Sequence, residues 1–189
     1  MAIIDPGKMR SIISETGEQL LVTIPMKKNW FIILFLAAWI VGWAVGEVTV
    51  STSFFKIGKD AAPMIFTVVW LVAWTVGGAF AIYTWFWQAF GKEIITVDGS
   101  YISTKKDIFG LGKLNQYQIT HIKNLRIAPM VYNPGDFQSG LQFWGLGGGI
   151  LAFDYGAKTC RFAIGIDEAE TNEILKRILY RNPSLAPKT

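Results

Sequence analysis

Two long apolar runs stand out in a chain whose other parts alternate hydrophobic and polar residues. Residues 30–50 contain one charged side chain, Glu47, and residues 61–90 contain none. An α-helix rises about 1.5 Å per residue and the hydrocarbon core of a bilayer is roughly 30 Å thick, so about 20 apolar residues span it. Both runs reach this length, and we expect two transmembrane helices joined by a short outside loop over residues 51–60.

Basic residues beside these runs indicate the orientation of the helices. Lys27 and Lys28 directly precede the first run, and Lys92 follows the second. Because cytoplasmic flanks carry the excess of Lys and Arg, we expect both termini on the cytoplasmic side, with these three lysines at the lipid headgroups. The first run lacks a small-residue cleavage site after a short apolar core, so we expect it to be a retained anchor.

An alternating pattern of another kind precedes the first run. The segment 20–24, LLVTI, keeps one purely apolar face at alternate positions, which is a strand period. Gly17 tolerates the positive φ of a tight turn, and Pro25 ends the element. The pattern predicts a cytoplasmic β-hairpin within residues 1–29, with an amphipathic interfacial helix as the alternative.

The strand period returns after the second run. Asp98-Gly99 is a strong hairpin signal between two alternating segments, and residues 156–158 separate two more. We therefore expect a cytoplasmic antiparallel β domain over residues 91–182. Its predicted strands are residues 93–97, 101–105, 114–119, 121–127, 149–155 and 159–164.

A helix is expected at the end of this domain, over residues 167–180. Asp167 is a good N-cap, and Glu170 completes an acidic variant of the capping box. The apolar stripe that packs on the sheet consists of Ile174, Leu175, Ile178 and Leu179. Residues 183–189 are expected to form a loose tail.

Small residues recur at four-residue spacing in both apolar runs. They are Gly42 and Gly46 in the first run and Ala73, Gly77 and Ala81 in the second. Small residues at this spacing make a smooth helix face that lets two backbones approach closely. We expect this face to pack the two helices together; the alternative is that it docks a helix of another protein.

Tryptophan is abundant, with eight residues in the chain. Trp39 and Trp43 lie four apart on one helix face, and Trp70 and Trp74 do so on the other helix. These pairs lie too deep for an interfacial aromatic belt. They are expected either to pack within the hairpin or to contact a partner helix, a pigment or a quinone.

A long segment rich in Gly, Pro and Asn, residues 128–148, interrupts the strand pattern. Loops of this length inside compact domains are usually functional or disordered. Its aromatic residues either cover the sheet, dip into the headgroup region or dock a partner. They are Tyr132, Phe137, Phe143 and Trp144.

Composition and motifs favour a protein without catalytic chemistry. His121 is the only histidine and Cys160 the only cysteine, so neither a Ser-His-Asp system nor a Cys/His metal site is indicated. Residues 145–149 (GLGGG) and 109–113 (FGLGK) lack the spacing of nucleotide-binding glycine motifs. The net charge of +4 is spread without a nucleic-acid stripe. We expect no enzyme activity, no cofactor and no nucleic-acid partner.

Three phrases carry a resemblance to a known class of protein: IPMKKNWF before the first run, GKEIITV after the second, and GILAFDYGAKTCRFAIGIDEAE before the last helix. They resemble bacterial membrane proteins that combine a two-helix anchor with a pleckstrin-homology-like (PH-like) domain. The resemblance implies an α+β membrane protein of the bacterial inner membrane, with an antiparallel PH-like barrel or sheet and a C-terminal amphipathic helix. It also implies that the N-terminal hairpin completes the sheet begun after residue 92.

A binding or scaffolding role follows from this resemblance. Lys105 and Lys106 lie where phosphoinositide-binding PH domains have basic residues, but they form no dense cluster, and phosphoinositide binding is not carried over. We expect a non-catalytic scaffold or accessory subunit that contacts a larger respiratory or photosynthetic membrane complex. The alternative is a membrane-anchored lipid-binding or signalling module that works alone.

Overall fold

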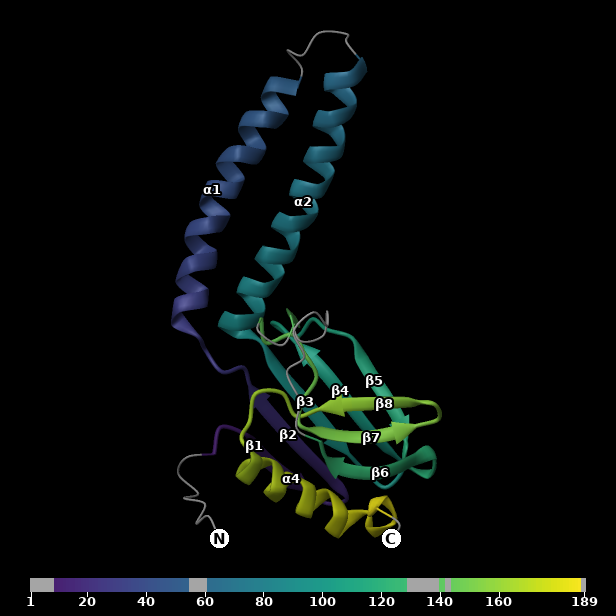
Figure 1. Cartoon of the computed structure of the whole chain (residues 1–189). Helices are drawn as coiled ribbons and strands as arrows, with labels where there is room; N and C mark the ends of the chain where they lie inside the picture. The colour runs from purple at the N-terminus through teal and green to yellow at the C-terminus, as the bar shows by residue number, and fades with distance from the viewer. Residues whose placement is uncertain (1–8, 55–60, 129–139, 142–143, 188–189) are drawn as a thin grey trace. The chain divides into compact units, whose positions relative to one another are not determined.

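The chain forms an α+β structure with two separate units. The computed structural model describes residues 9–54, 61–128, 140–141 and 144–187. One unit, the helical unit, is Lys28–Ala89, and the other, the β unit, combines Met1–Lys27 with Phe90–Thr189. Figure 1 shows the elements of both units by their labels.

Two long helices make up the helical unit. Helix α1 is Trp30–Phe54 and helix α2 is Ala61–Phe90, so both predicted helices are confirmed and the first extends four residues further. Both are long and apolar enough to span a membrane, with mean hydropathies of 2.1 and 2.0. Only 17% and 11% of their most apolar windows are buried, unlike the core helices of water-soluble domains.

The two helices pack along a seam of sheltered positions on α1. Such positions recur at alternating steps of three and four residues, a spacing typical of helices that pack side by side. They are Ile33, Leu36, Ile40, Trp43, Glu47 and Val50, and the neighbouring Ile32, Ala37 and Gly46 are sheltered as well. Across the seam, the Trp85 indole N–H donates to the backbone carbonyl of Ile33 at 3.1 Å.

A five-stranded antiparallel sheet forms half of the β unit, in the order β1-β2-β3-β4-β5. Its strands are β1 Ile12–Thr16, β2 Gln19–Pro25, β3 Lys92–Val97, β4 Tyr101–Asp107 and β5 Leu114–Gln118. Gly17 has a φ of +54° in the β1–β2 turn, as the sequence pattern required. The N-terminal hairpin is therefore confirmed, and the alternative of an interfacial helix is wrong.

The helical unit is inserted between two strands that are neighbours in this sheet. Strand β2 pairs with β3 from Leu20↔Val97 to Pro25↔Lys92. One further backbone bond follows the ladder, from the Met26 N–H to the Gly91 carbonyl at 2.9 Å. The pairing expected between the N-terminal hairpin and the strand after residue 92 is present.

A second sheet of three strands, in the order β6-β7-β8, completes the strand content of the described residues. Its strands are β6 Ile122–Ile127, β7 Leu151–Tyr155 and β8 Lys158–Phe162. The 3₁₀ turn Ile119–His121 joins β5 to β6, so His121 lies in a turn and not in a strand as expected. The described strands stay in two open sheets, because this turn interrupts the ladder, and they do not close into a barrel.

Both sheets and helix α4, Glu168–Arg181, contribute to one hydrophobic core. Ile174 and Ile178 are fully buried in it, which confirms the predicted apolar stripe. The Asp167 carboxylate caps α4 by accepting the N–H of Glu170 at 2.8 Å. The Glu170 carboxylate does not return to the cap as a capping box requires; it accepts the N–H of Ser11 at 2.5 Å and so ties α4 to the N-terminal hairpin.

Candidate functional site

The four deep tryptophans form one cluster within the helical unit. The rings of Trp70 and Trp74 stack with centroids 4.9 Å apart, and Trp39 lies 6.2 Å from Trp74. The Trp43 indole N–H donates to the backbone carbonyl of Trp74 at 3.0 Å. Packing within the hairpin, one of the two predicted roles, thus accounts for these contacts. Trp39 remains 36% exposed and is the member of the cluster with the most open surface.

Two glycines make room for this cluster. A Cβ at Gly78 would lie 2.0 Å from a Trp43 ring atom, so only glycine allows that ring its present place. At Gly46, a Cβ would lie 3.7 Å from the Trp74 ring, which is ordinary contact. Gly78 was not singled out from the sequence, although it is adjacent to a residue that was.

The predicted small-residue face is placed differently from the expectation. Gly46 and Ala81 are sheltered, in agreement with a contact between the helices. Gly42, Ala73 and Gly77 are exposed, and a Cβ at either glycine would meet nothing within 4 Å. The expectation that these three residues pack α1 against α2 is wrong, because the seam advances by steps of three and four while the chosen residues repeat every four.

Glu47 lies on the seam, and its carboxylate accepts the hydroxyl of Thr75 at 2.7 Å. Among the described residues, its second oxygen and the indole N–H of Trp74 are buried without a hydrogen-bond partner. Burying such groups in an apolar setting costs free energy. Glu47 therefore faces helix α2 and not open water.

The outward faces of the helices are apolar and open. Val45 on α1 and Val69 and Val76 on α2 are each more than 60% exposed. Large exposed apolar surfaces are typical of interfaces with lipid or with another protein. Gly42, Ala73 and Gly77 belong to this outward surface.

The three lysines predicted at the headgroups have different surroundings. Lys27 is exposed, and the Lys28 ammonium lies 5.9 Å from the centroid of the Trp30 ring. Lys92 is 3.6 Å from the carboxylate of Asp107 and keeps 44% of its side chain exposed. Asp107 also pairs with Lys105 at 2.7 Å, and these lysines hold the pKa of Asp107 below its ordinary value.

A buried carboxylate lies on β3, one residue after Lys92. Glu93 is 4% exposed and accepts the N–H of Ile164 at 2.7 Å. Burial raises its pKa from 4.5 to about 7, against the opposing effects of the backbone N–H groups of Ile164 and Ala163 and of the charge on Lys106. Lys106 is the cross-strand partner of Glu93, and partial burial lowers the pKa of its amine.

The predicted docking loop is only partly described. Trp144 is half-buried, while Tyr132, Phe137 and Phe143 lie outside the described residues. Beside the described end of this loop is an open hollow of about 240 Å³ whose lining includes Lys106 and Arg161. Both cations already donate to backbone carbonyls, Lys106 to Leu146 at 3.1 Å and Arg161 to Ala128 at 2.6 Å.

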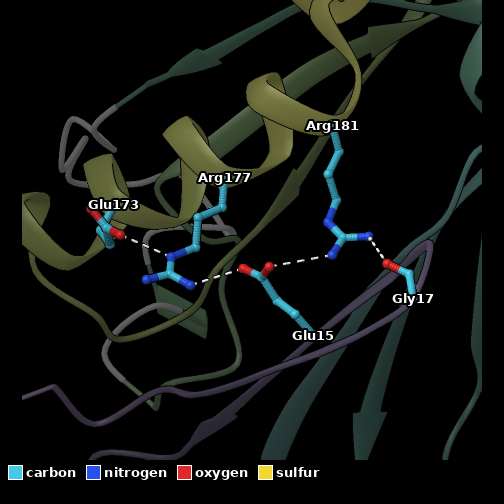
Figure 2. Close-up of polar contacts among 5 residues, drawn as sticks. All are labelled: Glu15, Gly17, Glu173, Arg177 and Arg181. Carbon is cyan, nitrogen blue, oxygen red and sulfur yellow. Dashed lines mark hydrogen bonds and ion pairs between the residues drawn. The ribbon is translucent and has the colours of Figure 1, made fainter.

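An ion network holds α4 on the N-terminal hairpin (Figure 2). Glu15 on β1 lies between two arginines of α4, 2.8 Å from Arg177 and 3.3 Å from Arg181. Arg181 also donates to the carbonyl of Gly17, and Arg177 pairs with Glu173 one turn earlier. These bonds lower the pKa of Glu15 and link the two ends of the described chain.

Two features of the β unit were missed in the sequence although signals existed. Glu93 occupies the same face as Ile95 and Val97 in an alternating strand, which places a carboxylate inward. The segment 109–113 was considered only as a nucleotide-binding glycine motif and rejected as one, yet Phe109 and Leu111 are 66% and 77% exposed. Exposed apolar residues at a glycine-containing turn are the signal that would have identified it.

No family model, curated protein or solved structure matches this chain. Within the part of the chain that the structure describes, no three His, Cys, Asp or Glu side chains are grouped to hold a metal ion.

Proposed function

We propose that the chain is a two-pass integral protein of the bacterial cytoplasmic membrane, with both termini in the cytoplasm, that holds a PH-like β unit at the membrane surface. In this proposal it is a non-catalytic scaffold or accessory subunit of a larger respiratory or photosynthetic complex. The helical unit is the anchor, and membrane lipids and other membrane subunits are its partners.

The observation that carries this proposal is the way the helical unit joins the β unit. Four residues, 26–29, separate β2 from α1, and Gly91 alone separates α2 from β3. Both connections leave adjacent strands that are paired to their ends. A domain that needed only to be tethered would require one flexible linker, whereas two short connections restrict its freedom at the membrane.

The exposed faces of the helices support the membrane part of the proposal. Side chains such as Val45 and Val69 would create a large apolar patch in water, but in a bilayer they contact lipid at no cost. The lysine pair Lys27 and Lys28 before α1, together with Lys92 after α2, suits a cytoplasmic interface.

Outward small residues support a partner helix. Since Gly42, Ala73 and Gly77 are not used between α1 and α2, their smooth surfaces are available to a second protein. The same surface is compatible with a pigment or quinone beside the exposed edge of Trp39. Identification of co-purifying pigments distinguishes these contacts.

The experiment that tests the accessory role is affinity purification from native membranes in a mild detergent. We expect a stoichiometric complex from the wild-type chain and a reduced yield of it from Gly77→Leu, because the larger side chain blocks a helix contact. Val69→Leu is the matched control, since it changes an outward residue that is already large. Migration of the wild-type protein only as a free monomer contradicts the accessory role.

A stand-alone lipid-binding module is the second candidate, favoured by the lysines at the connections to the helices. If it is correct, charge reversal at Lys27, Lys28, Lys105 and Lys106 abolishes the preference of the reconstituted protein for anionic lipids. Unchanged lipid preference in this variant would exclude that candidate.

A further inference from the structure

The turn that joins β4 to β5 presents apolar side chains at its surface. Phe109 is 66% exposed, Leu111 77% and Leu114 53%. Isolated exposed apolar residues are ordinary on protein surfaces, but three within six positions of one turn form a patch. We call residues 108–114 the apolar turn.

The backbone of the apolar turn is unfavourable for its first central residue. Ile108 and Leu111 exchange two backbone hydrogen bonds of 2.9 Å, and the two residues between them both have positive φ, +52° at Phe109 and +86° at Gly110. Turns of this kind favour Asn-Gly, because a bulky side chain is strained in the left-handed region. A phenylalanine that has a left-handed backbone and still leaves 66% of its surface exposed is costly at this position, which points to a use outside the fold.

Side chains from β4 hold the apolar turn in one conformation. The Lys105 ammonium donates to the Gly110 carbonyl at 2.6 Å. The Asp107 carboxylate accepts the N–H of the same glycine at 3.1 Å. Because the turn is ordered in advance, little conformational entropy remains to be lost when its tip binds a surface.

The position of the apolar turn along the chain identifies that surface. The ring of Phe109 lies 4.8 Å from the ring of Phe90, which is the last residue of α2. If α2 crosses the bilayer, its 30 residues extend about 45 Å, which covers the hydrocarbon core and the headgroup regions, so its last residue and an aromatic side chain in contact with it lie at the membrane interface. This step rests on the proposed membrane anchoring of the helical unit.

We propose that the apolar turn inserts into the headgroup and upper acyl region of the leaflet from which α2 emerges. Phe109 and Leu111 are the inserting side chains. The turn is then a third point of attachment between the β unit and the bilayer, beside the two connections to the helices.

The charges around the apolar turn suit an anionic leaflet. Lys113 is exposed within the turn, and Lys92 and Lys105 flank its base, where Asp107 offsets part of their charge. Basic residues at the surface of an anionic membrane are attracted to it, and apolar residues between them enter the interface.

The test is the depth of a nitroxide attached to the full-length protein in vesicles of phosphatidylethanolamine and phosphatidylglycerol. Cys160→Ala first removes the one native cysteine, and Leu111→Cys then carries the label. Ala157→Cys, in the exposed β7–β8 turn, is the aqueous reference. Val69→Cys, on the outward face of α2, is the reference for the membrane anchor itself.

We expect the label at position 111 to be several-fold more accessible to oxygen than to a water-soluble nickel complex, relative to position 157. If the label at position 111 is as accessible to the nickel complex as the label at position 157, while the label at position 69 is accessible mainly to oxygen, the turn does not insert and the anchor remains supported. Aqueous readings at both positions would overturn the anchor and the insertion together.

A second variant separates insertion from folding. Phe109→Asn supplies the residue that the turn geometry prefers, and Leu114→Thr keeps a strand-forming residue at the start of β5. With both changes, the β unit is expected to remain folded while the label at position 111 shifts toward the aqueous reading. An unchanged immersed reading would show that the apolar side chains do not drive insertion, and it would overturn the proposal.

Discussion

The β unit buries its apolar side chains in its interior, whereas the helical unit exposes many of them on its outer surface. In the β unit, Leu20, Ile95 and Ile174 are completely buried. In the helical unit, Val45 and Val69 are more than 60% exposed while the charged Glu47 lies between the helices. The β unit thus encloses its apolar side chains, whereas the helical unit exposes them, as expected for helices that span a membrane.

The two units can be followed by different signals, so their stabilities can be compared in one protein. Seven of the eight tryptophans belong to the helical unit, and Trp144 alone belongs to the β unit. Tryptophan fluorescence therefore reports mainly on the helices. Amide hydrogen exchange in β2, β3 and β7 reports on the core of the β unit.

The largest effect is expected from a cavity in the β unit. Ile174→Ala removes a fully buried side chain of α4 from the core and should cost about 2–5 kcal/mol of the free energy of unfolding. Faster amide exchange in the β unit with unchanged tryptophan fluorescence is the expected result. Equal destabilisation of both readouts would show that the units do not fold separately.

The next largest effect is a dependence of the stability of the β unit on pH, which the buried Glu93 causes. Because burial raises the pKa of Glu93 from 4.5 to about 7, the folded protein holds a proton that the unfolded chain releases, and stability falls as pH rises from about 4.5 to 7. Glu93→Gln should remove this fall and stabilise the β unit by up to about 3 kcal/mol above pH 7. The measurement is urea unfolding at a series of pH values.

A surface carboxylate provides the control for that titration. Glu18 is exposed in the β1–β2 turn, and Glu18→Gln controls for the loss of one carboxylate charge from the β unit. If Glu93→Gln leaves the pH profile unchanged, the assignment of the fall to Glu93 is wrong.

Substitutions at two adjacent glycines should affect the packing of the helical unit very differently. Gly78→Ala forces the Trp43 ring from its place and should cost about 1–3 kcal/mol, as expected for overpacking. Gly77→Ala is the matched control, because a Cβ there meets nothing within 4 Å. The measurement is unfolding in detergent followed by tryptophan fluorescence; equal midpoints for the two variants would contradict the described seam.

The smallest effect is expected at the ion network of α4. Glu15→Gln removes both arginine pairs, but these groups are exposed and screened by solvent, so the melting temperature should fall on the order of a degree. The loss should shrink as salt is added, and it should vanish at acidic pH, where the Glu15 carboxylate is protonated. A loss that does not depend on salt would show that the pairs act through packing.

The sequence predicted the elements better than their contacts. The apolar runs and the alternation around Leu20 were sufficient for the helices and the N-terminal hairpin, because periodicity depends on local sequence. Pairing of β2 with β3 bridges the whole helical unit, and no local pattern encodes it; only the resemblance to PH-like proteins implied it.

The candidate site shows where sequence pattern misleads. Gly42 and Gly77 match the four-residue spacing of small residues that is common in helix contacts. The contact between the helices instead involves Gly78, because the Trp43 ring occupies the space where a Cβ of residue 78 would lie. Phe109 and Leu111 in a glycine-containing turn were a visible signal, but the positive φ of Phe109, which makes this residue unusual there, could not be predicted from composition.

The central claim is that the helical unit spans the membrane and keeps the β unit on its cytoplasmic side. The most direct measurement is labelling of single cysteines in intact cells with a membrane-impermeant maleimide, in the Cys160→Ala background. Ser53→Cys, near the end of α1, should react in intact cells, and Ala157→Cys, in the β unit, should react only after the cells are permeabilised. Reaction of both positions in intact cells, or of neither until permeabilisation, would contradict the claim.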